Sequence, residues 1–367
     1  MTAWSDVRVI QTGTGTGNLT AVTGLASTPK FLFAMCVNRN GTGAATSLQL
    51  AYGAATATTE RWSASSFAAD AAVTSDVARY FTESALIAQL GSSAALRGAL
   101  DVASFDANGY TLTVDTAFTA DTSVIVWAVG GTDFTNVKAY AFQLAAATGN
   151  QDITEAGFQP SWNLFGLGTA TLDTIDAAQS RISLGVAAGP SDEWSVSYAL
   201  EDNAASNLAD AWGLVSTTRC IVSLSATSGA IVDAAEYTGV IVNGFNINRI
   251  TGTNTPFVGV LSVKGGQVKV GATAQRTDTN NQVVSGLGIG IPISLFIAGR
   301  PEITADQNVT ATSDVDVLIG VADAGGQAGI WGGIAHQATV DTTVNQYHHS
   351  TQMLPNRLIS SGADQGL

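Results

Sequence analysis

Carboxylates beside tryptophans are the residues with the clearest chemical potential in this sequence. Glu60 stands before Trp62, and Asp192-Glu193 stands before Trp194. Glycoside hydrolysis uses two carboxylates about 5–10 Å apart, and an aromatic ring gives a sugar a platform. The tryptophan recurs at Trp331 with no acid beside it. Because only the tryptophan recurs, we interpret Trp62, Trp194 and Trp331 as structural residues of equivalent strands and expect no catalytic residues.

The sequence holds few other candidates for nucleophiles or metal ligands. Its only histidines are His336, His348 and His349, and its only cysteines are Cys36 and Cys220. Neither a His-x-x-x-His nor a Cys-x-x-Cys spacing occurs, so we expect no metal site and place the histidines in a polar surface loop. An alternative is that His348-His349 meets a metal or a carboxylate across a symmetric interface. The cysteines are expected to be buried free thiols, which suits synthesis in a reducing cytoplasm.

Two glycine-rich runs resemble phosphate loops only superficially. They are GTGTG at 13–17 and GLGIG at 286–290. Neither ends in Gly-Lys-Ser/Thr and neither opens a predicted helix, so a phosphate would have no helix N-terminus to bind. A Gly-x-Ser-x-Gly nucleophile elbow is also absent. We therefore interpret both runs as hairpin turns and expect no cofactor.

Composition favours an all-β fold and excludes several classes of partner. Charged residues make up only 12% of the chain, and small and β-branched residues dominate, which is typical of many short strands. The net charge is -14 and no run of Lys or Arg occurs, so nucleic acid and anionic membrane surfaces are not expected partners. No secretory signal and no apolar run of about 18 residues is found.

The sequence is organised as an internal repeat. Pro29, Pro160 and Pro292 are separated by 131 and 132 residues, and each lies between a glycine and a Leu-Phe pair. A period of about 131 residues is the size of a domain rather than of a solenoid unit. We expect three tandem antiparallel β-sandwich domains of jelly-roll type, at 1–135, 136–267 and 268–367. Each copy is long enough to be a domain in its own right.

Hairpin signals support this architecture. Asn108-Gly109 and Asn243-Gly244 lie between alternating segments, and both positions of such a pair tolerate positive φ. The stretch Ala78–Leu90 is ambiguous, because its apolar residues could line one face of a helix. Its counterpart TTRCIVSLSA at 217–226 has the pattern of a strand, which we take as decisive for both copies.

The third copy has no Asn-Gly hairpin and no closing strand with a double glycine, so roughly 30 residues have no counterpart. A sandwich that lacks two strands would expose an unpaired edge. Three explanations remain open: a truncated sequence, a naturally shorter third unit, or completion by strands from a partner chain.

The recurring pattern resembles repeat domains of virion structural proteins in tailed bacteriophages and related prophage particles. The resemblance is carried by Gly157-Phe158-Gln159-Pro160, Leu164-Phe165, Trp194-Ser195, Asn108-Gly109-Tyr110 and Val129-Gly130-Gly131. It departs at Ala26-Ser27-Thr28-Pro29, where an aromatic residue is expected, and in the third copy, which lacks the hairpin.

The resemblance implies a jelly-roll building block of the particle surface, as head decoration, head fibre, spike base or tail-associated protein. It implies no catalytic residues, and its partners would be other capsid or tail proteins and further copies of the chain. Such a protein is made in the bacterial cytoplasm and located in the virion. The alternative is a host-glycan-binding module, for which Trp4, Trp162 and Trp212 remain as candidate exposed contacts. A polysaccharide-degrading enzyme is the third hypothesis.

Overall fold

The computed structural model describes residues 2–69, 76–91, 95–201, 211–271, 285, 288, 292–299, 315–335 and 343–353. Every regular element in these ranges is a strand, which confirms the all-β prediction. Within the same ranges, no helix is long and apolar enough to cross a membrane.

The first repeat forms a large and a small antiparallel sheet. The large sheet has the order β1-β11-β3-β5-β6-β7 and the small sheet the order β2-β10-β9-β8. The strands, with the additional β4, are β1 (Trp4–Gln11), β2 (Gly17–Asn18), β3 (Pro29–Cys36), β4 (Gly43–Thr46), β5 (Leu48–Ala57), β6 (Glu60–Ala68), β7 (Val77–Thr82), β8 (Ile87–Gly91), β9 (Ala95–Asp106), β10 (Gly109–Thr116) and β11 (Ser123–Gly130). The ambiguous stretch 78–90 is therefore strand and not helix, as its counterpart predicted, but it contains parts of two strands, β7 and β8.

The second repeat has the same topology strand for strand. Its large sheet runs β12-β21-β14-β15-β16-β17 and its small sheet β13-β20-β19-β18. The strands are β12 (Phe134–Gln143), β13 (Gly149–Ile153), β14 (Trp162–Leu167), β15 (Gln179–Gly189), β16 (Asp192–Glu201), β17 (Ala211–Ser216), β18 (Ile221–Leu224), β19 (Ile231–Ile241), β20 (Gly244–Thr251) and β21 (Phe257–Gly265).

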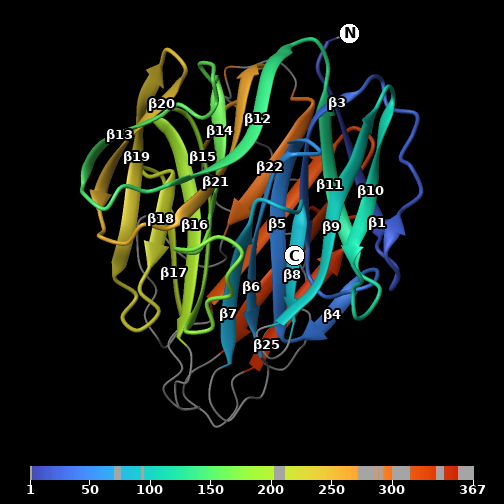
Figure 1. The fold of residues 1–367 in the computed structure, drawn as a ribbon, viewed down its shortest axis with the longest axis horizontal. Coiled ribbons are helices and arrows are strands. Elements are labelled where there is room, and N and C mark those ends of the chain that lie inside the picture. The colour runs from blue at the N-terminus through green and yellow to red at the C-terminus, as the bar shows by residue number, and fades with distance from the viewer. Residues whose placement is uncertain are drawn as a thin grey trace.

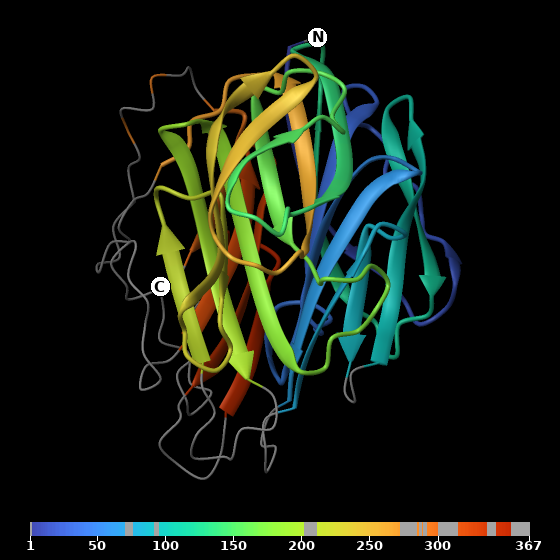
Figure 2. The same ribbon diagram turned by 60° about the vertical axis from the view of Figure 1, so that its left-hand side comes forward.

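The third repeat contributes one sheet among the described residues. Its order is β22-β23-β24-β25-β4, so the strand at one edge, β4, belongs to the first repeat. The strands of the third repeat are β22 (Ser294–Gly299), β23 (Val315–Asp323), β24 (Gln327–Ala335) and β25 (Thr343–His349). Figure 1 shows the first repeat in blue to teal on the right and the second in green to yellow on the left. The orange and red strands of the third run between and behind them, as Figure 2 shows from another side.

Alternation along the strands divides the interior into an outer and an inner core. In β3, Leu32 and Ala34 face the small sheet of the first repeat, whereas Phe31 and Phe33 face away from it. Successive side chains of a strand point to opposite faces, so a strand that is apolar at every position is buried on both. The large sheets are such two-sided sheets, and each complete repeat has its own outer core against its small sheet.

The inner core is shared by all three repeats, which the sequence did not predict. One cluster of buried side chains includes Phe33 and Trp62 of the first repeat, Leu164 of the second, and Val317 and Ile319 of the third. The repeats are therefore not separate bodies with a private core each. The large sheets of the three repeats surround one shared apolar core.

Three glycines identify equivalent positions in the repeats. At each one, a Cβ atom would lie within about 2 Å of a backbone carbonyl oxygen that crosses the sheet. The pairs are Gly53 with Leu86, at 2.1 Å, and Gly185 with Cys220 and Gly320 with Met353, both at 1.8 Å. This common close approach fixes the alignment of the third repeat on the other two.

This alignment agrees with the spacing of the three prolines but not with the assignment of the third tryptophan. Pro29 begins β3, and Pro160 and Pro292 each stand two residues before the equivalent strands β14 and β22. Trp62 is paired with Ala54, the residue after Gly53, and Trp194 is paired with Val186, the residue after Gly185.

In the third repeat, the residue after Gly320 is Val321, and its partner is Ala328. Trp331 pairs instead with Leu318, three positions further along β24. Its assignment as the third copy of the recurring tryptophan was therefore wrong, because the match was made on residue type without a strand register.

The two predicted hairpins are present, but their glycines act differently from the prediction. Gly109 pairs with Asp106 and Gly244 with Ile241, so each glycine is the first residue of a strand and lies after the turn. Neither Asn108, Gly109, Asn243 nor Gly244 has a positive φ. A Cβ atom on Gly109 would instead lie 1.8 Å from the carbonyl oxygen of Val22, and one on Gly244 would lie 1.8 Å from that of Ile153. These glycines allow a neighbouring backbone segment to approach closely.

Candidate assembly surface

The glutamates beside Trp62 and Trp194 each have a hydrogen-bond partner within their own repeat. Glu60 accepts a hydrogen bond from Thr56 Oγ1 at 2.9 Å, whereas Glu193 accepts one from the backbone N–H of Tyr237 at 2.9 Å. The two acids belong to equivalent hairpins of different repeats. Burial raises the pKa of Glu193 to about 7, and the Tyr237 N–H lowers it less strongly. Each acid is thus held by its own repeat.

His348 was expected in a surface loop and lies instead in strand β25, fully buried. It pairs across the strands with Ile330 and with Gly43 of β4. Burial lowers its pKa to about 4. Within the described ranges, no group of three His, Cys, Asp or Glu side chains could hold a metal ion. His336 lies outside the described residues.

Both cysteines are buried and free, as predicted. Burial raises the pKa of Cys36 to about 12 and raises that of Cys220 well above its usual range. A thiol reacts as its thiolate, so neither cysteine is poised as a nucleophile.

The first glycine-rich run was expected to be a hairpin turn; instead it connects β1 of the large sheet to β2 of the small sheet, two strands that do not pair with each other. Gly13 and Gly17 have φ values of 65° and 114°, a region that other residues rarely adopt. Most of the second run, at 286–290, lies outside the described residues.

The three tryptophans proposed as sugar contacts are engaged elsewhere. Trp162 is 5% exposed and belongs to the inner core. Trp4 is partly buried and donates its Nε1–H to Ser27 Oγ at 2.9 Å, and Trp212 donates its own to the carbonyl of Ala226 at 3.1 Å. Trp162 is therefore a core residue, and the indole N–H groups of Trp4 and Trp212 have partners within the chain.

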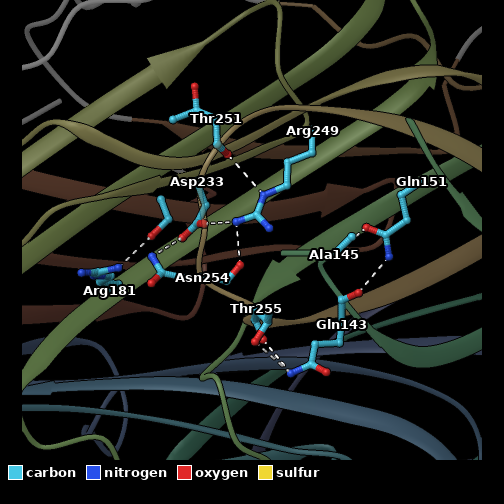
Figure 3. A network of polar contacts seen from close by, with 10 residues as sticks. Gln143, Ala145, Gln151, Arg181, Asp233, Arg249, Thr251, Asn254 and Thr255 are labelled. Carbon is cyan, nitrogen blue, oxygen red and sulfur yellow. Dashed lines mark hydrogen bonds and ion pairs between the residues drawn. The ribbon is translucent and has the colours of Figure 1, made fainter. Parts of the chain in front are cut away.

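A polar cluster lies inside the second repeat (Figure 3). The side chain of Arg249 is fully buried, and its guanidinium forms an ion pair with Asp233 at 2.5 Å. It also donates to the carbonyls of Asn254, at 2.6 Å, and Thr251, at 3.3 Å. The Asn254 amide donates to the second oxygen of Asp233 at 3.3 Å. Both oxygens of the carboxylate thus have partners, which fasten the loop after β20 onto β19.

Contacts between repeats follow one cyclic order. The opening strand of the second repeat touches the first, where the Ala139 N–H donates to Thr56 Oγ1 at 2.9 Å. The opening strand of the first repeat touches the third, where Ser5 donates to Asp323 at 3.5 Å. The opening segment of the third touches the second through a Lys269–Asp192 ion pair. Thr56, Asp323 and Asp192 all lie at the equivalent hairpin of their repeats, so the three repeats close a ring.

A second set of contacts follows the same order. The segment after β3 in the first repeat forms β4, which pairs with β25 of the third. The segment after β14 in the second repeat reaches β7 of the first, where Asp176 and Arg79 exchange both backbone hydrogen bonds at 2.9 and 3.0 Å. Their side chains also form an ion pair at 2.8 Å. In each case, a segment of one repeat forms backbone hydrogen bonds with the edge strand of a neighbouring repeat.

Aromatic rings join the repeats inside this ring. Phe31 of the first repeat meets Trp162 of the second edge to face, with centroids 5.9 Å apart. Phe296 of the third repeat stacks on Trp127 of the first at 5.9 Å and meets Phe33 edge to face at 5.4 Å. Such pairs have a preferred geometry, which favours one fixed arrangement of the repeats.

The edge of the third sheet at β22 is the place where the ring differs from its own repeat pattern. In the first two repeats, β11 and β21 pair with the strands equivalent to β22. Among the described residues, β22 has a strand on one side only, β23. Ile293 and Leu295 beside this edge are 38% and 37% exposed, among the few large apolar residues on the described surface. In the part of the chain that the structure describes, this edge and its two exposed apolar side chains form a candidate assembly surface.

Comparison of the chain with protein-family models, curated proteins and solved structures found no match. Function is therefore inferred from this geometry and from the sequence pattern.

Proposed function

We propose that this chain is a non-catalytic structural component of a bacteriophage virion, which assembles on the particle surface as a capsid decoration, head fibre, spike base or tail-associated protein. Its partners would be other capsid or tail proteins and further copies of itself. It would be made in the host cytoplasm and located in the virion.

The observation that carries the proposal is the closed ring of three repeats around a shared aromatic core. A ring of three similar units has approximate threefold symmetry, and symmetric assemblies offer positions that such a body can occupy. Tight aromatic packing between the repeats gives rigidity, which a load-bearing shell component needs. The two buried thiols have raised pKa values, and the buried carboxylate of the Figure 3 cluster is paired with Arg249, so a structural role fits them better than catalysis.

The experiment is to measure the mass of the purified chain in solution by light scattering, alone and mixed with purified structural proteins of the same particle. We expect a stable trimer, or a larger assembly that forms on mixing. Mass spectrometry of purified particles should then detect the chain as a stoichiometric component. A monomer that ignores these proteins and is absent from the particles would contradict the proposal.

A further inference from the structure

The chain contains three Asn-Gly pairs, and the proposed function uses none of them. They are Asn40-Gly41, Asn108-Gly109 and Asn243-Gly244. An asparagine that precedes glycine is open to an intramolecular reaction, because glycine has no side chain to keep its backbone nitrogen away from the asparagine side chain. All three asparagines are exposed, so exposure does not distinguish them. Their hydrogen bonds, however, differ from pair to pair.

The reaction is spontaneous deamidation. The backbone nitrogen of the glycine attacks Cγ of the asparagine side chain and closes a succinimide ring, while the side-chain amide leaves as ammonia with the proton of the glycine N–H. Water then adds to either carbonyl of the ring and opens it, which gives aspartate or isoaspartate. One water is consumed for each ammonia released, and no electrons are transferred. The reaction requires a free glycine nitrogen and an asparagine side chain that can rotate onto it.

At the first pair, both reacting groups are held by residues at the start of β11. The side-chain amide of Asn40 donates to Asp121 Oδ2 at 2.8 Å, and the Gly41 N–H donates to Ser123 Oγ at 2.7 Å. Asp121 is fixed in turn, because its other oxygen accepts a hydrogen bond from the Gly13 N–H at 2.7 Å. Attack would have to break both bonds of the pair, so the folded state protects Asn40.

The second pair is partly restrained. The carbonyl of Asn108 accepts a hydrogen bond from the Leu25 N–H at 2.9 Å. This carbonyl belongs to the same peptide group as the nitrogen of Gly109. The hydrogen bond therefore opposes the rotation that would bring this nitrogen to the asparagine side chain.

The third pair is the least restrained. Asn243 lies in the turn between β19 and β20, beside Val242, which is 82% exposed. Among the described residues, neither the side chain nor the carbonyl of Asn243 has a hydrogen-bond partner. Gly244 belongs to the last pair of the two strands, opposite Ile241, so local opening of a single pair frees its nitrogen.

We propose that Asn243 is a modification site, at which the folded chain deamidates spontaneously through a succinimide formed with Gly244. The reaction is slower at Asn108 and slowest at Asn40. This proposal goes beyond the proposed function and does not depend on it.

The modification changes the second repeat. Both products add a negative charge to the turn, and isoaspartate also lengthens the backbone by a methylene group. The Gly244 backbone lies against the carbonyl of Ile153, where even a Cβ atom would be only 1.8 Å from the oxygen. A longer backbone beside this contact therefore disturbs the pairing of β13 with β20.

The test incubates the folded full chain at mildly alkaline pH, below its melting temperature. Peptide mapping by mass spectrometry follows asparagine, aspartate and isoaspartate at each pair. We expect Asn243 to react at least about tenfold faster than Asn40, whose two hydrogen bonds must break first, with Asn108 between them. The control is the same chain unfolded in guanidinium, in which the three pairs should react at similar rates because the restraints of the fold are gone.

Variants of the restraint make the result specific. A chain with both Asp121→Ala and Ser123→Ala has lost the two partners of the first pair, and Asn40 should react at least about tenfold faster than in the unmodified chain. The rate at Asn243 should not change. Ser123→Ala alone is a milder variant that should change the Asn40 rate in the same direction, and thermal melting checks that each variant is folded.

A variant of the site itself tests the structural consequence. Asn243→Ser cannot form the succinimide at this position. Amide exchange of β13 and β20 should become faster as the unmodified chain ages, and it should stay constant in Asn243→Ser. Ageing that affects both proteins equally would overturn this consequence.

The site assignment would be overturned by similar rates at Asn243 and Asn40 in the folded chain. It would also be overturned if the folded restraint variants left the rate at Asn40 unchanged, or if Asn108 reacted while Asn243 stayed intact. These outcomes are independent of the virion role, which the light-scattering experiment tests.

Discussion

Trp62 of the first repeat packs on the backbone of Gly259 in the second. A Cβ atom on Gly259 would lie 2.3 Å from Trp62 Cδ2, and one on Gly166 would lie 2.5 Å from Trp62 Cζ3. The fully buried indole thus fills space that two strands of another repeat leave open by carrying no side chain. It is one of the contacts that make three similar repeats one body.

Filling that space should destabilise the protein. Gly259→Ala places a methyl group inside the contact distance of a ring that is packed on all sides, so either the strand or the indole must move. We expect a loss of about 1–3 kcal/mol in the free energy of unfolding, measured by urea denaturation. Gly189→Ala is the control, since no atom lies within 4 Å of its Cβ position. Equal stability of the two variants would show that the Trp62 contact is loose.

The hairpin glycines should matter more than the asparagines before them. Gly244→Ala brings a Cβ atom to 1.8 Å from the carbonyl oxygen of Ile153, which strains the pairing of β13 with β20. We expect it to cost about 1–3 kcal/mol. Asn243→Ala should stay within about 0.5 kcal/mol, because Asn243 has no positive φ to support. A larger cost for Asn243→Ala than for Gly244→Ala in denaturant unfolding would restore the turn-based explanation.

The ion pair in Figure 3 should be costly to break from one side. Asp233→Ala leaves the Arg249 guanidinium buried without its carboxylate, and an uncompensated buried charge costs about 3–5 kcal/mol. Asp6→Ala removes the partner of Arg8 in a pair that is 48% and 22% exposed, and it should cost less than about 1 kcal/mol. Both free energies of unfolding are measured by urea denaturation at pH 7. Similar losses for the two variants would mean that water reaches Arg249.

Glu193 should make stability depend on pH. In the equivalent position of the first repeat, Arg61 forms an ion pair with Asp101 at 2.8 Å, whereas Glu193 faces the like charge of Glu236. Burial raises the Glu193 pKa from 4.5 to about 7, so the folded state binds the proton more tightly than the unfolded state. The free energy of unfolding therefore falls as pH rises from about 4.5 to 7.

Glu193→Gln removes this dependence and keeps an acceptor for the Tyr237 N–H. The variant should be more stable than the unmodified chain at pH 8, by up to roughly 3 kcal/mol, and the difference should vanish near pH 4.5. Burial lowers the pKa of His348 to about 4, so its contribution to the free energy of unfolding decreases as pH falls below about 6.5. Its contribution is common to both proteins and cancels in the difference. A difference that does not change with pH would contradict the assignment.

The sequence by itself determined the class of the fold and its repetition. Strand periodicity and turn residues are local signals, so the all-β class, both Asn-Gly hairpins and the strands within 78–90 could be predicted. The period of about 131 residues agrees with the strand register, because Ala34, Phe165 and Ile297, the pairing partners of the three close-approach glycines, each lie five residues after the proline of their repeat. The buried state of Cys36 and Cys220 also followed from residue type.

Only the tertiary structure decided how the repeats use these strands. The sequence of a strand that is apolar on both faces does not specify which sheet covers each face. The inner core shared by the three repeats therefore could not be predicted from the local pattern. His348 was misplaced for the same reason, since its burial comes from β4, a strand of another repeat. Trp331 was misaligned because residue type without register cannot distinguish positions three residues apart. The reason for Gly109 and Gly244, close approach of a distant strand, likewise exists only once the sheets have packed.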